Sequence, residues 1–153
     1  MSLKFILIFL AVCIMMMYSK ICMADDCKHT ANSFNCVKYV DNFDGDSVTF
    51  DIPDVPAYFG HNAHVRVYGI DTPEMTSKSS CAKKVAIKAR NKVRDILSKA
   101  KKINLTNIGK EKYGRILANV IADGLDVGTT LVNEKLAYPY FGDTKKKLNW
   151  CKY

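Results

Sequence analysis

One long amphipathic helix constrains the fold of this chain more than any other feature. Between Ser79 and Lys101, apolar residues recur at roughly helical spacing, and lysines and arginines fill much of the opposite face. The segments around this helix have short alternating patterns of apolar and polar residues, which are typical of strands. This combination predicts a small α+β domain in which the helix packs on a curled sheet.

Three strands are expected before the helix. Residues 37–52 predict a strand, a turn at Asp44-Gly45 and a second strand, in which Asp46, Val48, Phe50 and Ile52 share one face and Ser47, Thr49 and Asp51 the other. Residues 53–63 contain two prolines and a glycine and predict a hairpin connection, and residues 64–70 predict the third strand.

The region after the helix predicts two more strands and a second helix. The expected elements are strands at residues 102–108 and 116–122, a hairpin turn at Asp123-Gly124, and a short helix capped by Thr129 or Thr130 that ends at Ala137. Five strands with a long helix after the third match a β-barrel of the oligonucleotide/oligosaccharide-binding type. This fold leaves catalysis open.

The first 24 residues have the features of a secretory signal. A basic start is followed by the apolar run FILIFLAVCIMMMY, and the small residue Ala24 precedes Asp25. The run is short for a membrane-spanning helix, so cleavage after Ala24 is favoured over an uncleaved membrane anchor. We therefore expect residues 25–153 to form one exported domain, periplasmic or secreted, monomeric and without stable membrane association.

The charge of the chain is consistent with an anionic partner. The chain has 23 Lys and Arg residues against 15 Asp and Glu residues, which gives a net charge of +8. The expected signal contains Lys4 and Lys20 and no acid, so its removal lowers the net charge by two, to +6. A surplus of this size favours a polyanion such as nucleic acid, anionic lipid or cell-wall polymer, although solubility alone also explains it.

Four cysteines remain after Ala24, and an even number in an exported domain favours disulfides. The spacing contains no C-x-x-C pair, so a zinc site is not expected. Four cysteines allow three pairings, which the sequence does not distinguish. We favour a local N-terminal bridge, Cys27–Cys36, and a bridge that holds the C-terminal tail, Cys81–Cys151.

Several polar residues stand where packing does not explain them. Asp46 shares the inward face of its strand with Val48 and Phe50, where an acid without a partner is costly. Arg66 lies within the strand HVRVYGI, and Asp71 and Glu74 follow where this strand stops.

The spacing of Arg66 and Asp71 sets a condition on any shared site. They are five residues apart, and an unbroken strand would direct their side chains to opposite faces of the sheet. They converge only if the strand ends or bulges between them, which Gly69 permits.

Taken together, these residues resemble the staphylococcal nuclease (thermonuclease) family. The resemblance runs in order from about Val37 to Tyr140, through the segments FDGDSVTF, VRVYGIDTPEM, EKYGRILANVIADG and LVNEKLAYPY. Family members are calcium-dependent nucleases that cut DNA and RNA and leave 3′-phosphates. The resemblance therefore implies Ca²⁺ as cofactor and nucleic acids as substrates.

The resemblance also implies roles for individual residues. Asp46, Asp71 and the Thr72 carbonyl would hold calcium, and Glu74 would position or deprotonate the attacking water. Arg66 and Arg115 would bind the scissile phosphate, flanked by Lys112 and Tyr113. Tyr138 and Tyr140 lie near the place where family members stack a base, but their spacing differs from the family pattern, so structural packing is an equal alternative.

The chemistry of these residue types agrees with this assignment. Calcium prefers hard oxygen ligands, and a guanidinium can donate two hydrogen bonds to a phosphate. The alternatives are a non-catalytic nucleic-acid-binding barrel and a disulfide-stabilised interaction protein. The complete set of acids and arginines favours the enzyme. The run Lys145–Lys147 is expected to be only solvated.

Overall fold

The computed structural model describes residues 27–153, so the expected signal segment lies outside the described residues. None of the helices in residues 27–153 is long and apolar enough to cross a bilayer. The elements follow one another as β1 (Ser33–Phe34), β2 (Lys38–Asn42), β3 (Ser47–Asp51), α2 (Ala57–Gly60), β4 (Ala63–Val67), β5 (Ile70–Asp71), α3 (Ser80–Lys99), β6 (Ile103–Lys110), β7 (Ile116–Ala122), β8 (Leu125–Asp126), α4 (Val127–Asn133) and β9 (Tyr138–Pro139).

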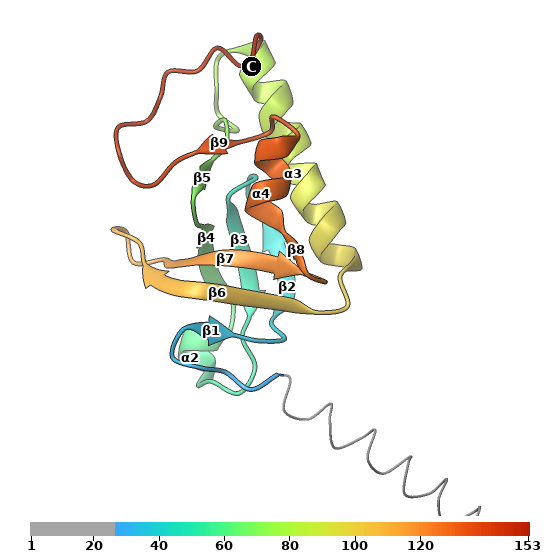
Figure 1. Ribbon diagram of the computed structural model, residues 1–153, viewed down its shortest axis with the longest axis vertical. Helices are drawn as coiled ribbons and strands as arrows, with labels where there is room; N and C mark the ends of the chain where they lie inside the picture. Colours follow the sequence, from blue (N-terminus) through green and yellow to red (C-terminus); the bar gives the residue numbers. More distant parts are fainter. Residues whose placement is uncertain (1–26) are drawn as a thin grey trace, which may run out of the picture.

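Seven of the strands form one curled sheet. Its order is β1-β6-β7-β4-β3-β2, with β8 paired to β7. The β4–β7 pair is parallel and the other pairs are antiparallel. The strands β6 and β7 run across β2, β3 and β4 (Figure 1), and the residue just before β2 approaches β6, where the Val37 amide donates to the Ile103 carbonyl at 2.9 Å.

The α+β prediction is therefore confirmed, but the strand count differs from the five-stranded barrel. The described strands form a paired path that ends at β1 and β2 and does not close into a ring. The extra strands are two residues long, too short to give an alternating pattern in the sequence. The expected strand over residues 64–70 is divided into β4 and β5, and β5 pairs with β9 in a second small sheet. The long helix consequently follows the fifth strand rather than the third.

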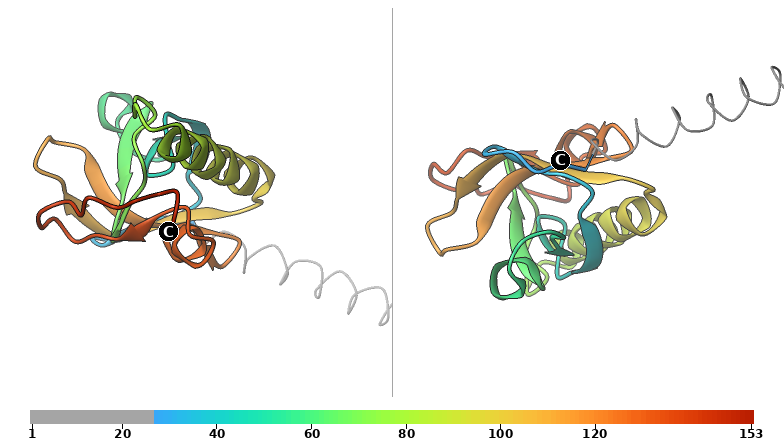
Figure 2. Two further views of the ribbon diagram at one scale, coloured as in Figure 1. Left: turned by 90° about the horizontal axis from the view of Figure 1, so that it is seen from above. Right: turned by 90° about the horizontal axis from the view of Figure 1, so that it is seen from below.

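Helix α3 covers one side of the curled sheet (Figure 2). It begins after Ser79, whose side chain accepts a hydrogen bond from the Ala82 amide. Its apolar face packs against β2 and α4. The buried residues of this face are Ala82, Ala86, Ala89, Val93 and Leu97. Of these, Ala89, Val93 and Leu97 belong to the same hydrophobic core as the strand residues Phe50 and Leu105, both fully buried.

Helix α4 corresponds to the second helix expected from the sequence. It differs from the prediction in both its first and its last residue. Its cap is Asp126, whose carboxylate accepts from the Thr129 amide at 2.7 Å, and not Thr129 or Thr130. The helix ends at Asn133, before Ala137. The preceding hairpin turn is confirmed, because Asp123 and Gly124 have φ values of 48° and 85°, as a tight turn of the primed type requires.

Both expected disulfides are present. Cys27 bonds to Cys36, and Cys81 at the start of α3 bonds to Cys151 in the tail. Each pair has a Cα–Cα distance of 5.2 Å, within the range of protein disulfides. The second bridge joins the C-terminal end of the chain to the N-terminal end of α3 (Figure 1).

We expect the Cys81–Cys151 bridge to stabilise the fold more than the Cys27–Cys36 bridge. It spans 70 residues against 9, and a longer closed loop restricts the unfolded chain more. Cys81→Ser/Cys151→Ser should lower the free energy of unfolding by about 2–5 kcal/mol, measured by urea denaturation without reductant. Cys27→Ser/Cys36→Ser is the matched control, and an equal or larger loss in that variant would contradict the chain-entropy explanation.

Candidate active site

Five separate segments, the last of them the C-terminal segment with Tyr140 and Lys145, meet at one end of the curled sheet. Ser47 at the start of β3 is paired with Arg66 near the end of β4, and the Val67 amide donates to the Asp46 carbonyl at 2.9 Å. The segment after β5 and the loop between β6 and β7 close the same region, which holds a cavity of about 330 Å³. The cavity is lined by Asp44, Asp46, Ser47, Arg66, Asp71, Thr72, Glu74, Glu111, Lys112, Tyr113, Arg115, Tyr140 and Lys145.

The break between β4 and β5 brings Arg66 and Asp71 together. Gly69 lies in this break with a φ of 77°, a conformation that favours glycine. The turn allows Arg66 Nη2 to approach Asp71 Oδ1 to 3.0 Å. The condition set by the spacing of the two residues is therefore met by the end of a strand and a glycine turn.

Arg66 is the centre of a buried cluster of charges. Its second terminal nitrogen, Nη1, lies 3.3 Å from Asp46 Oδ1, and all three side chains are 10% exposed or less. The other oxygen of Asp46, Oδ2, accepts hydrogen bonds from the Thr72 amide at 2.7 Å and the Thr72 hydroxyl at 2.8 Å. One guanidinium thus forms ion pairs with two buried carboxylates.

The burial of Asp46 disfavours its ionised form. Burial raises the pKa of Asp46 to about 6, even though the charge of Arg66 and the hydrogen bonds from Thr72 lower it. The nearby charge of Asp44 also raises this pKa. A further cation beside Asp46 would favour its ionised form.

Lys145 supplies a cation to the neighbouring acids. Its Nζ lies 2.9 Å from Asp71 Oδ1 and 3.1 Å from Glu74 Oε1. Partial burial alone would lower the pKa of Lys145, but the hydrogen bonds and charges of Asp71 and Glu74 outweigh it and raise the pKa above that of an ordinary lysine. The prediction that this lysine is only solvated is therefore wrong, because a tail without periodicity gave no sign of its fold.

Arg115 reaches the cavity from the residue just before β7. Its Nη1 donates to the Ser47 hydroxyl at 3.1 Å and its Nε to Glu111 Oε2 at 3.4 Å. The same Glu111 oxygen accepts from the Tyr113 amide at 2.9 Å, so Glu111 orders both the arginine and its loop. Lys112 lies over the exposed Tyr113 ring, with Nζ 4.9 Å from the ring centre.

The two tyrosines near the C-terminus have different surroundings. Tyr140 lines the cavity and is partly exposed. Tyr138 is 4% exposed, donates its hydroxyl to Asp71 Oδ2 at 3.0 Å and packs beside Trp150. The structure thus assigns Tyr138 to positioning Asp71, and the ring offers no free face to a base.

Asp44 also belongs to the site, although its place in the sequence predicted only a turn. It is buried, and its Oδ1 accepts from the amides of Asp46 at 2.9 Å and Ser47 at 2.7 Å. This aspartate fixes the turn that aims Asp46 into the cavity. Its signal in the sequence was the Asp-Gly-Asp turn itself, in which a side chain commonly binds the backbone two residues later.

The sequence model of staphylococcal nuclease homologues matches residues 64–150. The chain belongs to the staphylococcal nuclease family. The match includes Arg66, Asp71, Glu74 and Arg115 but begins after Asp46, whose place beside them comes from the pairing of β3 with β4.

Two curated relatives come from Bacillus subtilis (strain 168). The SPbeta prophage-derived endonuclease YokF is 33% identical over 107 residues, which cover 67% of this chain and 34% of the relative. Endonuclease YncB is 33% identical over 93 residues, which cover 58% of this chain and 44% of the relative. The chain thus spans less than half the length of either relative.

Members of the staphylococcal nuclease family depend on a metal, and the donor set fits a hard divalent cation. Asp46 and Asp71 provide buried carboxylate oxygens, the hard donors that such a cation prefers. The Lys145 ammonium shows that a cation is accommodated beside Asp71. Within residues 27–153 no group of three or more His, Cys, Asp or Glu side chains is placed to hold a metal ion. Backbone oxygen and water would have to complete such a site.

Proposed function

We propose that this chain is an exported nuclease that hydrolyses phosphodiester bonds of DNA and RNA, depends on calcium and leaves 3′-phosphates. The observation that carries the proposal is the shared cavity, in which two buried aspartates, two arginines and an accessible glutamate face one another. The family membership and the two endonuclease relatives support it. We further propose that the curled sheet is this chain's version of the family's five-stranded barrel, with short strands added.

The proposed metal ligands are Asp46, Asp71 and the backbone carbonyl of Thr72. Thr72 already donates two hydrogen bonds to Asp46, and Tyr138 donates one to Asp71. These contacts fix the carboxylates before any ligand arrives, which reduces the cost of ordering them. Calcium bound there would offset the negative charge of the phosphate.

The two arginines, one from β4 and one from the residue before β7, would bind the scissile phosphate. Negative charge grows on the phosphate oxygens during attack, and guanidinium groups aimed at these oxygens lower the barrier. Arg115 can turn towards the substrate because it is partly exposed and its contacts with Ser47 and Glu111 lie at 3.1 and 3.4 Å. Arg66 is held more firmly by its two aspartates and would act as a fixed donor.

Glu74 is the proposed general base, or the group that orients the attacking water. Its side chain is 64% exposed at the rim of the cavity, so water reaches it, in contrast to the buried aspartates. A carboxylate in this position can accept the proton of a water that attacks the phosphorus.

Sequence preference should be weak. The cations of the site, together with the exposed Lys112, suit phosphate oxygens, and such contacts carry no base information. Tyr140 and the exposed Tyr113 offer rings to any base, since stacking tolerates all four.

The direct test is digestion of plasmid DNA, single-stranded DNA and RNA by residues 25–153. We expect cleavage with calcium, none after chelation and recovery when calcium is restored. Magnesium should be a poor substitute, because it demands a tighter octahedral geometry. Product ends are checked with a phosphatase that acts on 3′-phosphates.

Two outcomes would contradict the proposal. Full activity in chelator would show that cleavage needs no metal at the proposed site. Binding without cleavage under every condition would favour a non-catalytic nucleic-acid-binding module.

A further inference from the structure

The C-terminal segment, residues 141–151, forms a strap over one end of the molecule. It leaves β9, which pairs with β5 through Asp71 and Tyr138, and it ends at the bridge between Cys151 and Cys81. Trp150 packs against Tyr138 with ring centres 6.0 Å apart, next to the bridge. The strap is therefore fixed at both ends, and its middle has no regular secondary structure.

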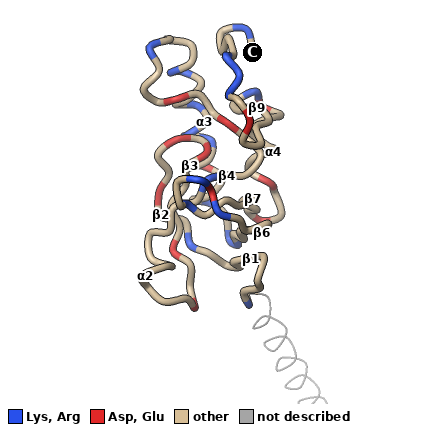
Figure 3. Tube along the Cα trace, turned by 90° about the vertical axis from the view of Figure 1, so that its left-hand side faces the viewer, with Lys and Arg blue, Asp and Glu red and all other residues tan. Residues whose placement is uncertain are grey.

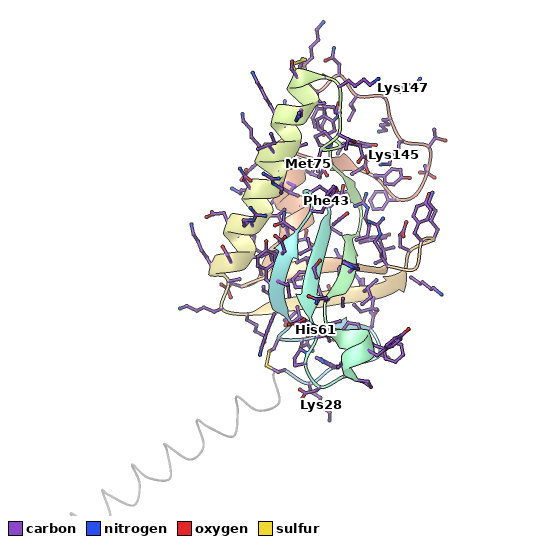
Figure 4. The ribbon with its side chains drawn as sticks, turned by 180° about the vertical axis from the view of Figure 1, so that it is seen from behind. Lys28, Phe43, His61, Met75, Lys145 and Lys147 are labelled. Carbon is purple, nitrogen blue, oxygen red and sulfur yellow. A yellow bond between two sulfur atoms is a disulfide. The ribbon has the colours of Figure 1, made fainter. Side chains whose placement is uncertain are left out.

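The strap carries three consecutive lysines, which form a continuous basic stretch (Figure 3). Lys145 is the one that enters the site, with Nζ at 2.9 Å from Asp71 and 3.1 Å from Glu74 (Figure 4). Lys146 and Lys147 pair with no acid in the part of the chain that the structure describes. Lys146 and Lys147 are therefore internal controls for the effect of Lys145.

The position of Lys145 conflicts with a bound divalent cation. Its ammonium contacts Asp71 Oδ1, the oxygen that also receives Arg66 Nη2 at 3.0 Å. A divalent cation held by Asp71 would stand within a few ångströms of this ammonium, and like charges at that distance repel strongly in a partly buried site. The Lys145 side chain is 52% exposed and long enough to turn into water, whereas Arg66 is buried.

From this geometry we propose that Lys145 is a built-in counter-ion that competes with the divalent cation for Asp71 and Glu74. The inference rests on the proposed metal site. In the metal-free protein the ammonium neutralises the two acids, and when the metal binds, Lys145 withdraws and frees Glu74. The Cys81–Cys151 bridge keeps the strap, and with it Lys145, close to the acids.

The test measures calcium binding itself, by calorimetry and by terbium luminescence, on the full mature chain. Lys145→Ala should bind calcium more tightly than the parent by roughly 5-fold, the range expected for losing partly exposed ion pairs. The same variant should unfold at a lower temperature than the parent in chelator, because two acids lose their counter-ion. Lys145→Arg should restore both properties towards those of the parent.

Two matched controls separate this competition from general charge. Lys146→Ala removes the same charge one residue away and should leave calcium affinity unchanged. Cys81→Ser/Cys151→Ser loosens the strap without removing Lys145 and should tighten calcium binding in the same direction, whereas Cys27→Ser/Cys36→Ser should not.

The outcomes are distinguishable. Equal or weaker calcium binding by Lys145→Ala, with a parent that binds calcium, overturns the competition and leaves the proposed nuclease standing. An equal gain in Lys146→Ala also overturns it, since the effect would then be one of overall charge. A parent that binds no calcium overturns the metal site, and the competition with it.

Discussion

Arg115→Ala should cleave DNA about 10²–10³-fold more slowly than the parent, or worse, while its folding stability changes little. The rate should fall because a donor to the developing phosphate charge is lost. Stability should hold because Arg115 is partly exposed and its guanidinium forms hydrogen bonds to Ser47 and Glu111, neither of which is a buried charge pair. Single-turnover cleavage of a labelled oligonucleotide and thermal unfolding measure the two effects.

Arg66→Ala should slow cleavage by a similar factor. It should also unfold more easily than the parent. Its guanidinium is buried between Asp46 and Asp71, and removing one partner from a buried ion pair typically costs about 3–5 kcal/mol. The two variants should therefore differ in folding stability, although both cleave slowly. Arg115→Lys is the conservative control, and it should remain impaired because an ammonium lacks the paired donors of a guanidinium. An Arg115→Ala protein that cleaves like the parent would show that Arg115 does not contribute to catalysis.

Much of this site follows from the sequence because local rules and the tertiary structure agree there. The alternation in β3 correctly placed Asp46 on the inward face, beside Val48 and Phe50. The five-residue spacing of Arg66 and Asp71 demanded a break in the strand, and the turn at Gly69 provides it. In both places the backbone geometry alone limits where the side chains can point.

The features that the sequence did not indicate depend on contacts between distant segments. Lys145 reaches acids more than seventy residues away through a strap without periodicity, and only the disulfide suggested where that strap runs. The burial of Tyr138 likewise depends on Trp150 and on the pairing of β9 with β5. No spacing rule reports such contacts, because neither a helical nor a strand period connects the residues involved.

Glu74→Gln should slow the chemical step by about 10²–10⁴-fold, the usual contribution of a positioned general base. Glutamine keeps the size of the side chain and can still orient a water, but it does not accept the proton. Glu74 is 64% exposed, so the substitution should leave the fold intact. Binding of single-stranded DNA, measured by fluorescence anisotropy with calcium present, should stay close to that of the parent, because Asp46, Asp71 and both arginines remain.

Glu134→Gln provides the matched control for this variant. Glu134 pairs with Lys92 on the surface and is 42% exposed, so the substitution removes one carboxylate of similar exposure away from the cavity. It should cleave like the parent. A Glu74→Gln protein that also cleaves like the parent would show that another group accepts the proton. A variant that neither binds nor cleaves would instead assign Glu74 to holding the metal, since the loss would then precede the chemical step.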